Sequence, residues 1–245
     1  MDKAQTRRKI IEGQQKRISF LEGKASEALA AKLYELGEID DRKLAKILKT
    51  IHEQYGRIAE VASREYYEQL RAVDISELYH AYGGDLSISN KYINEKIAEY
   101  KTKRERAGDD EAIRFLSMLV GNNVKIIAWK TVSSNGEADK RSKLFARVPR
   151  GATTCAFCMM LASRGFVYYT ANTAGALMQY HHHCDCAIVP AFNRSPDIAG
   201  YDHQKLYDKY LRARDKAGTK KELHFDSPED TKLILKEMRK LYEVK

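Results

Sequence analysis

The chain has 245 residues, of which 43 % are hydrophobic and 31 % are charged, and its formal net charge is +9 with a pI of about 9.2. This length allows one or two domains with a sizeable core. No run of about 18 apolar residues occurs, so no transmembrane helix is expected. We therefore expect a soluble globular protein. Its positive charge indicates nucleic acid or an acidic protein as a neighbour, unless it only reflects solvated, lysine-rich helices.

Two long helices are predicted at the start of the chain. Apolar residues at spacings of three and four predict the first over residues 1–37, with Gly37 as its end. The second is expected from Asp40 or Asp41 to about Ala72, with a heptad-like apolar seam. A short turn between them favours an antiparallel hairpin whose seams form a core. A coiled-coil contact with another subunit is the less favoured alternative.

The helical pattern continues after a break over residues 73–88. A third helix is expected from about residue 89 to 106, and a fourth begins at Asp109. The polar stretch 133–143 fits either a continuation of that fourth helix or a loop. No proline occurs before Pro149, which also favours a mostly helical first half.

Cations gather at two places in this helical half. Those in the last turns of the third helix suit its dipole and are also a candidate phosphate-binding patch: Lys101, Lys103, Arg104 and Arg106. The cluster Arg7-Arg8-Lys9 could touch phosphate as well, but a frayed, solvated terminus is the favoured interpretation.

All four cysteines lie in one segment, in the pattern C-x2-C-x25-C-x-C. Sulfur and imidazole at such spacing are typical of a zinc site closed by four protein ligands. The candidate ligands are Cys155, Cys158, His181, Cys184 and Cys186. Two sets of four ligands remain possible. One combines Cys155, Cys158 and Cys184 with His181, and the other uses the four cysteines.

Other uses of these residues are less favoured. Disulfides need an oxidising compartment, which the polar, charged start of the chain does not indicate. Reduced or redox-active thiols are a further alternative. The metal is expected to be structural, because the chain lacks H-x-E and H-E-x-x-H. Ser163 is not in a G-x-S-x-G elbow, and Asp202-His203 is only a fragment of a His-Asn-His nuclease signature.

Short strands are expected around the cysteines, at residues 145–149, 166–169 and 187–189. After them, helices are predicted over residues 201–216 and from Ser227-Pro228 onward. The fold class is therefore mainly α with a small α+β zinc-knuckle-like segment. The expected regions are a helical one over 1–143, a metal-binding one over 144–195, and C-terminal helices over 196–245.

The strings FARVPRGATTCAFCMMLASRGFVYYTANTAG and YHHHCDCAIVP resemble the core of the Mu F-like head morphogenesis proteins. These are minor head proteins of tailed phages and prophages, with C-x2-C followed by H-x2-C-x-C. The close match covers about 50 residues, from Phe145 to Phe192. Many members have a proline directly after the motif's histidine, where this chain has an all-histidine triplet.

The resemblance implies a phage minor capsid protein that acts in head assembly, inside the virion head or in the host bacterial cytoplasm. Portal and other head proteins are the implied partners, with the DNA backbone as a further candidate and no membrane. Two other functions stay open: a sequence-independent DNA-binding zinc protein, and a capsid maturation protease or nuclease. No catalytic residues are assigned, and Zn²⁺ is the expected structural metal.

Overall fold

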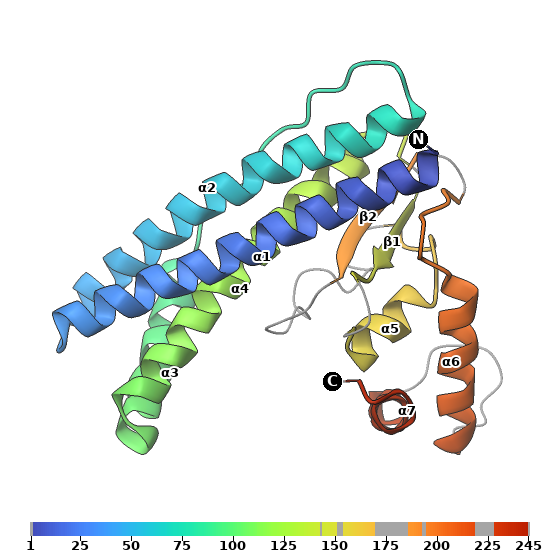
Figure 1. The fold of residues 1–245 in the computed structure, drawn as a ribbon. Coiled ribbons are helices and arrows are strands. Elements are labelled where there is room, and N and C mark those ends of the chain that lie inside the picture. Colours follow the sequence, from blue (N-terminus) through green and yellow to red (C-terminus); the bar gives the residue numbers. More distant parts are fainter. Residues whose placement is uncertain are drawn as a thin grey trace.

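The computed structural model describes residues 2–142, 144–150, 154–169, 186–192, 195–218 and 228–244. Within them, helices and short strands alternate only in the second half of the chain (Figure 1). In chain order the elements are α1 (Lys3–Leu36), α2 (Asp41–Asp74), α3 (Asn90–Ala107), α4 (Asp109–Ala138), β1 (Leu144–Val148), α5 (Ala156–Ala162), β2 (Ala187–Ala191), α6 (His203–Lys216) and α7 (Pro228–Tyr242). The prediction of a mainly helical fold is confirmed.

Helices α1 and α2 form the predicted hairpin. Asp40 caps α2 by accepting a hydrogen bond from the Lys43 amide at 2.9 Å. Gly37 ends α1 with a φ of 60°, a conformation that glycine adopts without a steric penalty. Figure 1 shows the two helices side by side, with α4 behind them.

The first helix is not frayed at its start, and that prediction is wrong. Arg7 is 5 % exposed and donates to Asp74 at 2.5 Å and to the Asp197 carbonyl at 2.9 Å. Arg8 donates to Glu12 and to the Pro149 carbonyl. These arginines therefore join the start of α1 to the end of α2 and to the segments around Pro149 and Asp197.

Helices α1 to α4 share one apolar cluster, which includes Leu29, Leu33, Leu44, Ile97 and Leu116. Helix α4 persists through the polar stretch to Ala138, where Asn135 is buried and donates to the Tyr82 carbonyl at 2.9 Å. A buried ion pair also holds α4 against α1. Lys125 of α4 lies 2.7 Å from Glu22 of α1, and both are buried. Among the helices of the described ranges, none combines the length and apolarity that a membrane span requires.

Two strands form a small antiparallel sheet, in which Phe145 pairs with Pro190 and Arg147 with Ile188. Phe145 exchanges both backbone hydrogen bonds with Tyr168 on its other side. Its pair with Pro190 is therefore of the non-hydrogen-bonded kind, and the missing proline N–H breaks no ladder bond. The predicted strands near 145–149 and 187–189 are confirmed, while the 166–169 run contributes one isolated bridge.

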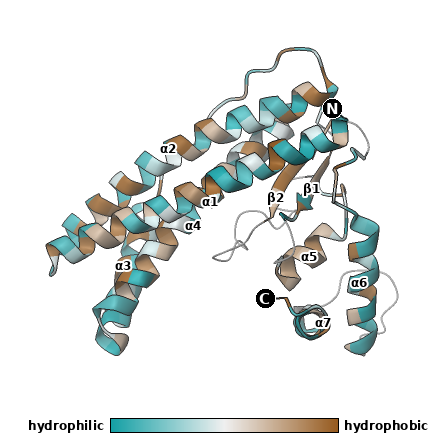
Figure 2. Ribbon diagram, viewed as in Figure 1, coloured by the Kyte–Doolittle hydropathy of each residue, from teal (hydrophilic) through white to brown (hydrophobic). Residues whose placement is uncertain are grey.

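The sheet, α5, α6 and α7 pack onto one end of the helical bundle through a second apolar cluster. Trp129 of α4 and Tyr66 of α2 lie in it with their rings 6.1 Å apart and edge to face. Figure 2 shows β2 as hydrophobic and α6 as largely hydrophilic, which agrees with a buried strand and a helix at the surface.

Candidate metal centre

Two elements, helix α5 and the start of strand β2, bring the described cysteines together. Cys155 is the N-cap of α5, and its sulfur accepts a hydrogen bond from the Cys158 amide at 3.3 Å. Cys158 lies in the first turn of α5, and Cys186 directly precedes β2. The C-x2-C pair thus lies at the start of a helix. All three side chains are buried.

Cys158 and Cys186 form a close sulfur pair. Their Sγ atoms lie 2.9 Å apart, and the residues are 0 % and 1 % exposed. A disulfide bond has a length of about 2.05 Å, so the two sulfurs are not covalently joined. A tetrahedral zinc with Zn–S bonds of about 2.3 Å separates two sulfurs by roughly 3.8 Å. A shift of about 1 Å would therefore let this pair share one zinc ion.

A buried arginine contacts this pair, and sequence reasoning missed it. Arg147 of β1 is 0 % exposed, and its Nη2 donates to the Cys186 sulfur at 2.7 Å. A guanidinium this close stabilises the thiolate form of the sulfur over the thiol. One signal was available: Arg147 is a single cation in the otherwise apolar strand Leu144–Val148, just before C-x2-C.

Aromatic and aliphatic side chains surround the sulfurs. Tyr168 is buried, its hydroxyl donates to the Leu161 carbonyl at 2.8 Å, and burial raises its pKa to about 12. Burial also raises the pKa of Tyr201, whose hydroxyl donates to the Ala162 carbonyl at 2.7 Å. Both hydroxyls thus donate to carbonyls of α5, the helix that carries Cys158.

The other predicted ligands, His181 and Cys184, lie outside the described residues, as do His182 and His183. Over the described residues, no group of three or more His, Cys, Asp or Glu side chains is placed to hold a metal ion. Cys158 and Cys186 suit one half of the predicted shell in chemistry and burial, whereas their sulfurs would have to move apart by about 1 Å. The zinc site itself stays a prediction.

The residues weighed for catalysis, Ser163, Asp202 and His203, each contact another part of the fold. The Ser163 hydroxyl is buried and donates to the Met160 carbonyl at 2.8 Å. His203 is the first residue of α6 and lies against Gly165, where an added Cβ would be 3.0 Å from its ring. Asp202 caps α6 by accepting from the Lys205 amide at 3.0 Å, which lowers the pKa of its carboxyl. Each of these contacts is structural.

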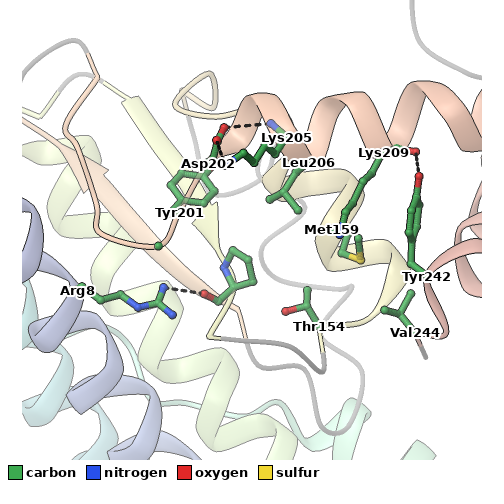
Figure 3. A pocket seen from close by; sticks show the side chains of 12 residues that line it. Arg8, Thr154, Met159, Tyr201, Asp202, Lys205, Leu206, Lys209, Tyr242 and Val244 are labelled. Atoms are coloured by element: carbon green, nitrogen blue, oxygen red, sulfur yellow. Dashed lines mark hydrogen bonds and ion pairs between the residues drawn. The ribbon is translucent and has the colours of Figure 1, made fainter.

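A cavity of about 350 Å³ lies next to the cysteine segment, between α5 and the two C-terminal helices. Figure 3 shows Met159, Leu206 and Val244 around it. Its polar groups largely bind one another: Arg8 reaches the Pro149 carbonyl, and the Tyr242 hydroxyl donates to the Lys209 carbonyl. The cavity therefore offers an apolar surface rather than a reactive group.

The candidate phosphate patch lies at the end of α3, far along the chain from the cysteines, and is partly neutralised. Lys101 lies 2.6 Å from Asp41, and Arg104 donates to Asp109 at 2.5 Å. Lys103 lies over the Phe115 ring at 5.1 Å from its centroid. The two ion pairs reduce the charge that this surface offers to DNA.

Comparison of the sequence with known proteins connects this chain with a phage protein. The profile of the VG15 protein family matches residues 5–213, which is most of the chain. A curated relative, the Gene 15 protein of Mycobacterium phage D29, is 31 % identical over an alignment that covers 24 % of this chain and 32 % of that protein. The match thus spans about a third of the length of that relative. No solved structure matches the chain.

Proposed function

This chain belongs to the VG15 protein family, and we propose that it is a minor capsid protein of a phage head, with one structural zinc. The observation that carries the proposal is the family match over residues 5–213, together with a relative encoded by a phage. The finer assignment to the Mu F-like head morphogenesis proteins belongs to this proposal. It is supported by the described part of the motif, with Cys155, Cys158 and Cys186 buried beside one sheet.

The partner surface that we propose is the outer face of the α1–α2 hairpin, on the side away from α4. Arg17 and Glu65 form an ion pair across this face at 2.7 Å, with both side chains about half exposed. One turn from this ion pair, toward the α1–α2 connection, lie Phe20 of α1 and Val61 of α2, whose side chains are 62 % and 44 % exposed. Ile58, one turn further in the same direction on α2, is 47 % exposed. Apolar side chains gathered in this way favour contact with another protein.

A groove continues this face toward the start of α1. It has a volume of about 290 Å³ and is lined by residues of both helices, including Ile10, Gly13 and Gln69. An added Cβ at Gly13 would meet no atom within 4 Å. Small and apolar residues on neighbouring helices let a partner helix approach closely, so a portal or head protein could bind along the hairpin.

The zinc would be held by Cys158 and Cys186 together with two of the other candidate ligands, Cys155, Cys184 and His181. A structural zinc supplies folding free energy, because its ligands are not preorganised in the unfolded chain. Here it would fasten α5 to the start of β2, two segments that are distant in sequence.

The test is co-purification of the chain with the portal and head proteins of its phage, with elemental analysis of the purified chain. We expect binding and about one zinc per chain. Replacing Phe20 and Ile58 by serine is expected to weaken the binding at least about tenfold. Tyr207→Ser, which alters an exposed residue of α6, serves as the control. Unchanged binding after both substitutions would exclude the proposed surface. A chain that binds no head protein would exclude the capsid role.

Sequence-independent DNA binding is the second candidate, and the charge of +9 favours it. It predicts binding to duplex DNA that weakens steeply with salt. Lys103→Glu and Arg106→Glu would weaken such binding if the α3 patch mediates it. A purified chain that does not retain DNA at low salt would exclude this function. The capsid proposal does not depend on the outcome.

A further inference from the structure

The groove on the outer face of the α1–α2 hairpin extends to the start of α1. A second hollow of about 470 Å³ follows the one of about 290 Å³, and both are lined by Ile10 and Gln69. Together the two hollows run along α1 from Lys3 to Arg17. At 1.5 Å per residue this stretch is about 20 Å long, which is the length of roughly four turns of another helix.

The floor of this groove is apolar. Ala62 and Tyr66 of α2 are 3 % and 2 % exposed, and Ile10 and Val73 are half-buried. Gly13 leaves one side of the groove open, because an added Cβ there would meet no atom within 4 Å. These residues let a further helix lie against α1 and α2 at the interaxial distance of about 8–10 Å that packed helices have.

The groove is lined by positive charges. Of the described residues that line it, three are cations and none is acidic; the cations are Lys3, Lys9 and Arg17. Arg17 is balanced by Glu65 at 2.7 Å. Lys9 is exposed and forms no ion pair within the described part of the chain. Its charge is therefore available to a partner.

A single carboxylate serves two cations at the start of the groove. Asp74 lies 2.5 Å from Arg7 and 3.4 Å from Lys3. One negative charge cannot balance two positive ones, so positive charge remains in excess at this carboxylate, and Lys9 adds to it. Electrostatic complementarity therefore favours an acidic partner along the groove.

We infer that this groove binds an acidic amphipathic helix of a partner protein. The inference deepens the proposed function, in which that partner is a portal or head protein, and it rests on the hairpin being the contact surface. Apolar residues at spacings of three and four on the bound helix would lie on the groove floor, and its acidic flank would face Lys3 and Lys9. DNA fits this groove less well, because a phosphate backbone offers no apolar face to Ile10 and Val73.

The test uses the purified full-length chain and three probes. The first is a synthetic peptide of about 18 residues with leucines on one helical face and glutamates beside them. The second peptide has lysine at every glutamate position, and the third probe is a DNA duplex of about 20 base pairs. We expect the acidic peptide to bind at least about tenfold more tightly than the basic one. Its binding should weaken as the salt concentration rises.

Two pairs of variants locate the binding site. Gly13→Leu fills the groove and is expected to weaken binding of the acidic peptide at least about tenfold. Gly23→Leu is its matched control, because Gly23 also lies in open space on α1 but does not line the groove. Lys9→Glu is expected to weaken the same binding about three- to tenfold. Lys46→Glu makes the same change of net charge at an exposed position of α2 outside the groove, and should leave the binding unchanged.

Three results would overturn the inference: equal binding of the two peptides, no binding of the acidic peptide at about 1 mM, or equal effects of Gly13→Leu and Gly23→Leu. A duplex that binds more tightly than the acidic peptide, and that is weakened by Lys9→Glu but not by Gly13→Leu, would also overturn it, since the groove would then be a phosphate-binding surface. Failure of the capsid role gives a different result, in which the acidic peptide binds in the groove but no head protein of the phage binds the chain.

Discussion

The helical bundle and the cysteine-bearing half of the molecule are stabilised in different ways. In the bundle, leucines such as Leu29, Leu33 and Leu116 form an apolar cluster, and the buried charges of Lys125 and Glu22 cancel each other. In the other half, a guanidinium and two sulfurs are buried among apolar side chains. Apolar packing is non-directional and tolerates adjustment, whereas buried polar groups depend on their partners. Different treatments should therefore destabilise the two halves.

Removal of the metal is expected to have the largest effect, and to be confined to one half. A site that holds zinc at about 1,000 times its Kd contributes about 4 kcal/mol to the stability of the folded state. A strong chelator should therefore lower the unfolding temperature. Amide hydrogen exchange should accelerate over residues 144–169 and 186–192, while Leu29 and Leu116 keep their protection.

Cys186→Ala is the control for this treatment. This variant should bind little zinc, unfold at a lower temperature than the wild type, and respond to the chelator hardly at all. Faster exchange spread evenly over both halves would contradict the comparison. An unchanged unfolding temperature in the wild type would contradict the metal site.

Leu116→Ala is expected to produce the reverse pattern, with a loss of about 3 kcal/mol and no loss of zinc. Leu116 of α4 is fully buried at the centre of the bundle, so the deletion leaves a cavity. Leu78→Ala is the matched control, since Leu78 is 87 % exposed, and it should change the unfolding free energy by less than about 0.5 kcal/mol. Urea unfolding with a zinc assay on the same samples measures both quantities. Zinc loss in Leu116→Ala would show that the halves are not independent.

Gly136→Ala tests the junction between the halves. A Cβ added at Gly136 near the end of α4 would lie 2.5 Å from the buried ring of Phe145 in β1. The ring has little room to move, so we expect a destabilisation of about 1–2 kcal/mol. Gly13→Ala adds the same methyl group to α1, where it meets nothing within 4 Å, and should stabilise by about 0.5–1 kcal/mol. The urea unfolding midpoint should fall in Gly136→Ala and rise in Gly13→Ala. An unchanged midpoint in Gly136→Ala would mean that β1 can move away from α4.

The same contrast explains which parts of the fold and of the candidate site can be predicted from the sequence. The four bundle helices follow from local signals: apolar spacing, the cap at Asp40 and the stop at Gly37. The contact between Arg147 and Cys186 joins residues 39 positions apart, and no local pattern specifies such a pair. The short helix α5 has no such local signal, because AFCMMLA has no polar face. The start of the chain is expected to be frayed from its sequence, because Arg7 and Asp74 each look solvated until the fold pairs them.

The smallest expected effect is a pH dependence that comes from the bundle alone. His52 of α2 is 6 % exposed, and its Nε2 lies 3.0 Å from the Leu86 carbonyl, to which it donates when neutral. Its Nδ1 has no hydrogen-bond partner among the described residues. Burial lowers the pKa of His52 from 6.5, against smaller opposing effects of the Leu86 hydrogen bond and Glu53. The unfolded chain therefore binds a proton at His52 more readily than the folded chain does.

Since the unfolded state takes up the proton first, the stability linked to neutral His52 is present above about pH 6.5 and is lost as the pH falls below that value. His52→Gln cannot titrate but can still donate to the Leu86 carbonyl. Urea unfolding at about pH 7.5 and pH 5.5, with a chelator present throughout to take the zinc ligands out of the comparison, should show a larger loss for the wild type than for His52→Gln. Equal losses would mean that water reaches Nδ1 when His52 is charged, and that the loop around Leu86 opens more easily than its contact with α2 indicates.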